Sequence, residues 1–481
     1  MKSSLTLCCL YLMLFTLALV LPNQALNDFN QNTQVSTPTR QMFQTPAQEV
    51  GDTKSFWAVD YDEDEYYTAY AYLLAIGDHC YIYFEDLVIS ILGQEEANAR
   101  AEIYQEEFDA NIYPRVTDIA GDPNGTLGDI DGDPRVYILI VEKRQSYYRQ
   151  SNEIEGDHSN MCEMVYICYR TSDPLNTIAH EFHHLVWFNY EFDEVHFILE
   201  GAAEYATYYA GHVPDDNLTV RVSDFLNDPD DSLIYFEVEA QDYGACYLFA
   251  FYLAEQYGEQ FLRDLVQHDG DGALGLETAL AEAGHNTTFN ELYLDWMTTL
   301  TIDETGFADD RYCLLDIDAA IQGYTTIDSF PYQDKNLSLY CYGSKVYRLI
   351  SPPDNFAIEM SQPANDVAGL SVAYRDTNGW HVQQTQKQGK AIMNVTGESI
   401  ETAHIIASYL FVDTPAGNID FGTGPRETVQ VLIHEINGTS TTMPPPSNND
   451  LALIITAVSM PVAAMIVVLV LILQRRKEMN V

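Results

Sequence analysis

The spacing of hydrophobic positions changes twice along the chain. Between residues 55 and 141, short runs of aromatic and β-branched residues predict strands around one helix. From about residue 173 to about residue 303 the hydrophobic residues recur at helical spacing. After residue 305 they alternate with polar residues in short runs. The pattern predicts a strand-and-helix region, a mostly helical region and a β-rich region, in that order.

The predicted elements follow from these runs. The first region has predicted strands at 55–60, 71–77, 80–86 and 136–141 and a helix at 94–112. The second has predicted helices beginning at 173 and covering about 195–210, 243–256, 261–267, 274–283 and 289–300. The third has predicted strands at 345–350, 357–360, 369–375, 381–386, 404–412 and 428–436. Their regular turn spacing favours a small β-sandwich.

Both ends of the chain carry apolar segments. Residues 1–25 have a basic start at Lys2, an apolar run and a plausible cleavage site, which predicts a secretory signal peptide, with a retained anchor as the alternative. Residues 451–473 contain no charge and are long enough to span a bilayer, and three basic residues follow in 474–481. The positive-inside rule then predicts a single-pass protein whose N-terminal bulk lies outside the cell.

The charge is strongly one-sided. The chain has 72 acidic and 23 basic residues and a formal net charge of −49. Nucleic-acid binders of the usual kind need clustered Lys and Arg, so we exclude that class. Hydrophobic residues make up 47% of the chain, which is enough for a large core.

The cysteines and sequons extend the secretory interpretation. Of the eight cysteines, Cys8 and Cys9 would leave with the signal peptide. An even number remains, and in an oxidising compartment this predicts disulfides of unknown connectivity, with Cys313–Cys341 as a guess. N-glycosylation sequons begin at Asn124, Asn217, Asn286, Asn336, Asn394 and Asn437.

The most informative motif lies in the helix that begins at residue 173. His180 and His184 are four residues apart, so both rings project from one helical face and can bind one metal ion. Glu181 is one residue further along, where its carboxylate could act as a general base on a water molecule. Imidazole ligands suit zinc, and a third protein ligand would leave one coordination position open. Two histidines hydrogen-bonded at a helix surface are the structural alternative.

A second helix offers the third ligand. Glu200 lies in the sequence FILEGAAEYA, after a short connection that could return the chain to the two histidines. Glu204 lies on the same face of that helix and is the competing ligand, although we expect it to orient a histidine ring instead. A solvent-exposed acid in a helix first turn is the alternative for Glu200.

Together these motifs resemble the gluzincin metalloproteases, and are most similar to the hyicolysin-type family. The signature is an AHEFxH helix followed by an LxEGxxEY helix. Supporting resemblances are SNMCEMVYI, GDIDGDPRVYILIV, DYGACYLFAFYLAEQYG and FNELYLDWMTTLTID, so the likeness covers about residues 53–305. The chain departs from the family at Leu199, where an Asn is usual.

The resemblance implies a fold, a site and a reaction. It implies an α+β, zincin-like catalytic domain with a mixed-sheet and a helical subdomain, zinc held by His180, His184 and Glu200, and Glu181 as general base. Tyr243 matches the family's YGA segment and could stabilise an oxyanion. A packed aromatic residue is at least as good an interpretation of Tyr243.

The predicted organisation follows from these expectations. It is a signal peptide at 1–25, a flexible lead-in at 26–52, a zinc metalloprotease domain at 53–305, a β-rich domain at 306–436, a stalk at 437–450, a transmembrane helix at 451–473 and a cytoplasmic tail at 474–481.

An Asp-rich loop suggests a second metal. Asp129, Asp131 and Asp133 alternate in sequence, and alternating oxygen ligands suit calcium. Pro134 stands where an EF-hand requires Gly, and a polar turn is the simpler interpretation.

The function we expect is that of a cell-surface, membrane-anchored zinc metalloendopeptidase acting on proteins or peptides. The alternative is an adhesion or binding protein on an inactive protease scaffold. The presence of all three ligands and the glutamate base favours the enzyme.

Overall fold

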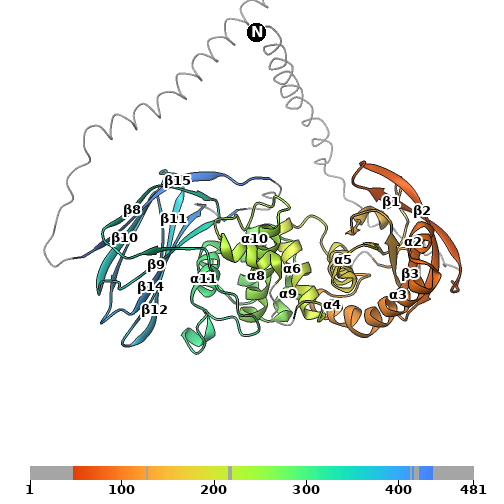
Figure 1. The fold of residues 1–481 in the computed structure, drawn as a ribbon, viewed down its shortest axis with the longest axis horizontal. Helices are drawn as coiled ribbons and strands as arrows, with labels where there is room; N and C mark the ends of the chain where they lie inside the picture. The colour runs from red at the N-terminus through yellow and green to blue at the C-terminus, as the bar shows by residue number, and fades with distance from the viewer. Residues whose placement is uncertain (1–46, 126–127, 215–218, 412–413, 416–421, 437–481) are drawn as a thin grey trace, which may run out of the picture. The chain divides into compact units, whose positions relative to one another are not determined.

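The computed structural model describes residues 47–125, 128–214, 219–411, 414–415 and 422–436 (Figure 1). By its internal contacts the chain divides into two compact units, Met1–Tyr190 and Glu191–Val481. Each unit is described here by itself.

The first unit contains a six-stranded mixed sheet with strand order β1-β2-β3-β4-β6-β5. Strands β1, β2 and β3 are antiparallel, β3, β4 and β6 are parallel, and β5 is antiparallel to β6. The strands are β1 (Thr53–Asp60), β2 (Glu65–Ile76), β3 (Cys80–Glu85), β4 (Val136–Val141), β5 (Tyr147–Tyr148) and β6 (Met164–Cys168). The helices are α2 (Asp86–Leu92), α3 (Gln94–Glu107), the π-helical turn η1 (Phe108–Ile112), α4 (Tyr113–Ala120), the 3₁₀ turn η2 (Gln150–Asn152) and α5 (Pro174–Phe188).

The parallel strands form the centre of this sheet. β4 and β6 are buried along their whole length, as expected for parallel strands that read as continuous hydrophobic runs. Helix α3 packs on β2 and β3, and α5 packs on β6. The strand that precedes α5 is therefore fixed in the core, and so is the start of the helix that carries the histidines.

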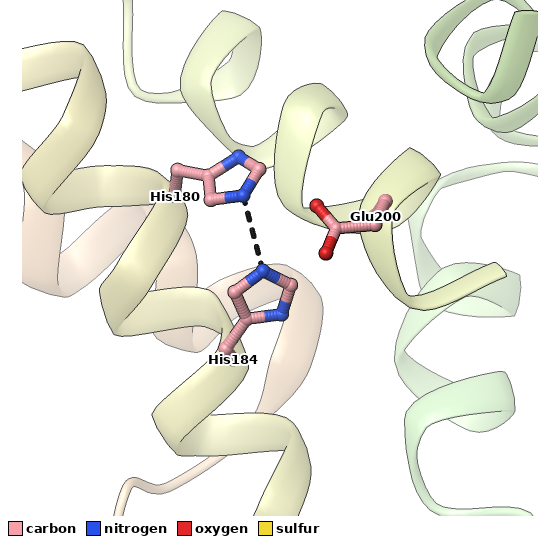
Figure 2. Close-up of side chains that lie close together, drawn as sticks. All are labelled: His180, His184 and Glu200. Atoms are coloured by element: carbon pink, nitrogen blue, oxygen red, sulfur yellow. Dashed lines mark hydrogen bonds between the residues drawn. The ribbon is translucent and has the colours of Figure 1, made fainter. Parts of the chain in front are cut away.

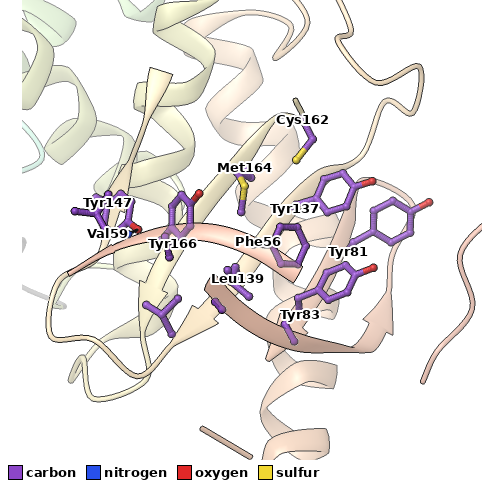
Figure 3. Packing of buried hydrophobic residues seen from close by; sticks show 14 of the residues in the cluster. Phe56, Val59, Tyr81, Tyr83, Tyr137, Leu139, Tyr147, Cys162, Met164 and Tyr166 are labelled. Atoms are coloured by element: carbon purple, nitrogen blue, oxygen red, sulfur yellow. Dashed lines mark hydrogen bonds between the residues drawn. The ribbon is translucent and has the colours of Figure 1, made fainter. Parts of the chain in front are cut away.

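Tyrosine side chains fill much of the core on one face of the sheet (Figure 3). The ring of Phe56 meets Tyr83 edge-to-face at a centroid distance of 5.0 Å and lies 6.1 Å from the ring of Tyr137. The side chain of Gln48 bridges the two phenols, because its Nε2 donates to Tyr137 Oη at 2.8 Å and its Oε1 accepts from the Tyr83 hydroxyl. The Tyr137 hydroxyl donates in turn to Asp131 Oδ2 at 3.0 Å.

The second unit begins with helices and continues with two sheets. The helices are α6 (His196–Tyr209), α7 (Val220–Asn227), α8 (Ala240–Tyr257), α9 (Glu259–Val266), α10 (Gly272–Glu282), α11 (Phe289–Ile302) and the 3₁₀ turn η3 (Ala308–Asp310). The strands are β7 (Tyr324–Ile327), β8 (Tyr332–Tyr340), β9 (Ser344–Leu349), β10 (Asn355–Ser361), β11 (Val367–Asp376), β12 (Gly379–Gln388), β13 (Lys390–Thr396), β14 (Thr402–Leu410) and β15 (Arg426–Glu435).

These strands form a four-stranded sheet, β13-β10-β15-β8, and a five-stranded sheet, β12-β11-β14-β9-β7. Helix α11 packs on β11 and β14 of the five-stranded sheet. Buried hydroxyls join the two layers, since Thr298 Oγ1 lies 2.7 Å from Ser371 Oγ and Tyr293 Oη lies 2.9 Å from Ser344 Oγ. The helices and the sheets of this unit therefore share one packed interior.

The expected fold class requires a correction. Residues 451–473, where the sequence predicted a membrane-spanning helix, lie outside the described residues, as do the predicted signal peptide, stalk and tail. Within the described residues no helix has both the length and the apolar character needed to cross a membrane. The described chain is a mixed α/β structure with three sheets, and the predicted single-pass, cell-surface localisation does not stand.

The predicted disulfides are also wrong for the described residues. Cys80, Cys162, Cys168, Cys246, Cys313 and Cys341 are all buried free thiols, so the suggested Cys313–Cys341 pair is not formed. The even number of cysteines was misleading, because it carries no information about the distances between their sulfur atoms. Burial raises the pKa of the Cys80 and Cys162 thiols, which keeps them protonated and unreactive.

Thiol titration checks this correction. In the native protein we expect slow reaction with a thiol reagent, because all six described cysteines are buried. After unfolding without reductant, all six should react at once. A thiol count that rises only when a reductant is added would contradict the structure.

Candidate metal centre

The metal-binding motif lies in α5, whose position is set by its two ends and its buried face. The Asp173 side chain caps the helix by accepting a hydrogen bond from the Asn176 N–H at 3.2 Å, and Pro174 occupies the first turn. On the buried face, the ring of Phe182 packs against Phe108 at 5.0 Å and against Tyr113 at 5.7 Å. The predicted start of this helix is confirmed.

His180 and His184 lie one turn apart on α5 and point the same way (Figure 2). Their Nε2 atoms are 3.0 Å apart, and their rings meet edge-to-face with centroids 4.7 Å apart. One donor atom each from His180, His184 and Glu200 of α6 lie within 4.8 Å of one another. All three side chains are half-buried.

This donor set fits zinc. Two nitrogens bound to one tetrahedral zinc lie roughly 3.3 Å apart at the usual bond lengths, close to the separation of the two Nε2 atoms. Two imidazoles and one carboxylate are also a common protein ligand set of catalytic zinc. The three residues expected from the sequence as ligands are therefore grouped, whereas Glu204 is not part of the group.

Glu181 follows His180 on α5 and is buried, with 8% of its surface exposed. The phenol of Tyr61, the residue that follows β1, is close enough for the charge of Glu181 to affect its pKa. Burial raises the pKa of Tyr61, the Arg149 guanidinium opposes the change, and the Glu181 carboxylate reinforces it. No sequence motif indicated this tyrosine, because it is distant from α5 along the chain.

His183 is buried although it precedes the proposed ligand His184, and only 1% of its surface is exposed. Its ring lies 5.7 Å from the ring of Trp187 and 6.5 Å from that of His184. We infer that it supports the helix from the buried side.

Glu204 and Tyr243 belong to a separate polar group on α6, α7 and α8. Glu204, which is 6% exposed, forms an ion pair with Arg221. The Arg221 guanidinium lies 4.3 Å from the centre of the Tyr243 ring, and Phe236 meets that ring edge-to-face at 5.0 Å. Arg221 is thus one partner of Glu204, and the orienting role of Glu204 toward a histidine ring stays a prediction. The oxyanion role of Tyr243 stays a prediction.

The Asp-rich loop is only partly as expected. Asp129 and Asp131 group with Glu163, which the sequence analysis did not consider. Asp133 instead forms an ion pair with Arg135 at 3.0 Å and accepts a hydrogen bond from Tyr81 Oη at 2.6 Å. A further acidic group consists of Glu191, Asp193 and Asp271.

Comparisons with known proteins do not assign a family. No protein family model matches the chain, and no curated protein sequence matches it. Among solved structures, the surface-associated copper-binding protein CorA of Methylomicrobium album BG8 aligns at 9% identity and a TM-score of 0.18, over 24% of this chain and 98% of that one. A family GH115 4-O-methyl-α-glucuronidase aligns at 10% identity and a TM-score of 0.14, over 63% of this chain and 51% of that one. Scores this low carry no argument about fold or activity.

Proposed function

We propose that this protein is a zinc-dependent metallopeptidase of the gluzincin type. The observation that carries the proposal is the donor group of His180, His184 and Glu200, with Glu181 next to the first ligand on α5. The resemblance of the two helical motifs to the hyicolysin-type family supports it. No family match supports it, so the proposal depends on the site and its motifs.

The proposed role of each residue follows from its chemistry. His180, His184 and Glu200 would hold the metal through two ring nitrogens and one carboxylate oxygen. A bound zinc ion would supply Lewis-acid polarisation of a peptide carbonyl and lower the pKa of water. Glu181 would accept the proton of the attacking water at a carboxylate oxygen and deliver it to the nitrogen of the departing amine.

The proposed substrates are proteins or peptides. With a net charge of −49, the chain would repel polyanions, so nucleic acids are unsuitable substrates. The site alone does not define a preferred residue beside the cleaved bond.

Metal analysis and digestion test the proposal together. The purified protein should contain one zinc ion per chain at the histidine site and should cleave unfolded casein or a quenched peptide. A zinc chelator should abolish the cleavage, and added zinc should restore it. A protein that holds zinc and cleaves no peptide would favour the inactive scaffold, and a protein that binds no zinc would reject both interpretations.

A further inference from the structure

Two loops that lead into neighbouring parallel strands bring carboxylates together in the first unit. β4 and β6 pair in parallel with Tyr137 opposite Met164, and the Tyr137 N–H donates to the Glu163 carbonyl oxygen at 2.8 Å. Residues that precede the two strands therefore meet at the same edge of the sheet. Asp129 and Asp131 precede β4, Glu163 precedes β6, and one oxygen from each lies within 4.8 Å of the others.

Backbone amides hold these carboxylates in place. The Gly132 N–H donates to Asp129 Oδ1 at 2.6 Å, and the Asp133 N–H donates to Asp131 Oδ1 at 2.9 Å. The Ile130 N–H donates to Glu163 Oε1 at 2.7 Å, which links the loop before β4 directly to the residue before β6. The group is therefore ordered by main-chain contacts from within the loop.

The burial of Glu163 points to a missing cation. Only 2% of Glu163 is exposed, and among the described residues its Oε2 atom has no hydrogen-bond partner. Asp131 is 9% exposed, so two of the three carboxylates are shielded from water. Taking a carboxylate out of water is costly unless a cation or several hydrogen-bond donors compensate its charge.

The cationic side chains near the group have other contacts, although the Lys54 ammonium opposes the rise in the pKa of Asp131 that burial causes. The ammonium of Lys54 lies over the ring of Tyr137, 4.3 Å from its centre. Arg135 is engaged with Asp133. A further buried carboxylate, Glu153, is 3% exposed and adds negative charge. Burial, reinforced by the Glu153 carboxylate, raises the pKa of Glu163 to about 8.

We propose that Asp129, Asp131 and Glu163 bind one calcium ion, with main-chain carbonyls or water completing its shell. An all-oxygen, carboxylate-rich set suits a hard cation. Two oxygens bound to one calcium ion lie at most roughly 5.2 Å apart, and the three oxygens of this group lie within that limit. Asp133 is not among the grouped donor residues, and its two oxygens accept instead from Arg135 and Tyr81.

The calcium ion would also stabilise the C-terminal end of α5 through the neighbouring segments. In the loop before the site, the Asp122 N–H donates to Tyr190 Oη at 2.9 Å. On the other side, Asn189, which caps the C-terminal end of α5, donates from Nδ2 to Glu153 Oε2 at 2.7 Å. Calcium would therefore order the segment against which the histidine-bearing helix ends.

Calcium binding to the full-length protein tests the proposal. After treatment with a calcium-selective chelator in the presence of zinc, equilibrium dialysis with calcium should show a site that Glu163→Gln weakens by on the order of 10- to 100-fold. Terbium in place of calcium should emit on tyrosine excitation, because Tyr137 hydrogen-bonds to the ligand Asp131. Asp133→Asn and Glu191→Gln are the controls, and both should keep the terbium signal.

Folding of the variant is measured separately. Without calcium, Glu163→Gln should unfold at the same or a higher urea concentration than the wild type, since it removes a buried charge. With calcium, only the wild type and the two controls should gain stability. Three results would overturn the proposal: no calcium binding by the wild type, full binding by Glu163→Gln, or equal loss in Asp133→Asn and Glu163→Gln.

Discussion

Replacing Glu181 by Gln should lower kcat/KM for a quenched peptide by roughly 10²- to 10⁴-fold, while the zinc content stays unchanged. The amide has nearly the shape of the carboxylate but cannot accept a proton from water. Glu181 is not among the three grouped donor residues, so its replacement removes no proposed ligand. Because the side chain is buried, a neutral amide there should also leave the fold intact.

Three measurements on the same preparation separate the possible results. Metal analysis reports whether the site is loaded, thermal unfolding reports whether the variant is folded, and single-turnover kinetics report the chemical step. A folded, zinc-loaded Glu181→Gln protein that cleaves at the wild-type rate would falsify the proposed mechanism.

His180→Ala, His184→Ala and Glu200→Ala should each weaken zinc binding by roughly 100-fold or more, since each removes one of three protein ligands. Glu204→Ala is the matched control for Glu200→Ala, because both residues lie on α6. The Glu204 carboxylate is paired with Arg221, so its loss should leave the zinc affinity within about tenfold of the wild-type value.

Competition with a chromogenic zinc chelator measures these affinities. If Glu204→Ala loses zinc and Glu200→Ala retains it, the two glutamates have exchanged roles. Arg221→Ala would then be expected to affect zinc binding as well, because it frees the Glu204 carboxylate.

Local sequence signals predicted several elements correctly. The strand at Val136–Val141 and the start of α5 at Pro174 are confirmed, because a buried apolar run and an Asp-Pro cap act within a few residues. The predicted helix at 94–112 was too short, since the helical conformation continues past Pro114 to the end of α4 at Ala120. The π-helical turn η1 precedes this proline, and its wider spacing accommodates a residue that lacks an N–H and would crowd an α-helical turn.

The errors concern contacts between residues that are far apart in sequence. Glu163 joins Asp129 only through the pairing of β4 with β6, which no local pattern encodes. Arg221 of α7 pairs with Glu204 of α6, a contact between two helices that neither segment indicates by itself. The number of cysteines likewise did not reveal that the six thiols stay unpaired in the described residues. The histidine pair was predictable because both rings lie on one helix with a fixed period.

The bridge made by Gln48 has a consequence for proteolytic trimming of the N-terminus. A cut before Ala47 leaves the bridge in place. A cut at residue 53, the predicted start of the catalytic domain, removes the Gln48 acceptor of the buried Tyr83 hydroxyl, at a cost of about 1–3 kcal/mol. It also removes the amide donor to Tyr137, whose hydroxyl holds Asp131. The shortest stable form of the first unit therefore begins upstream of its first strand.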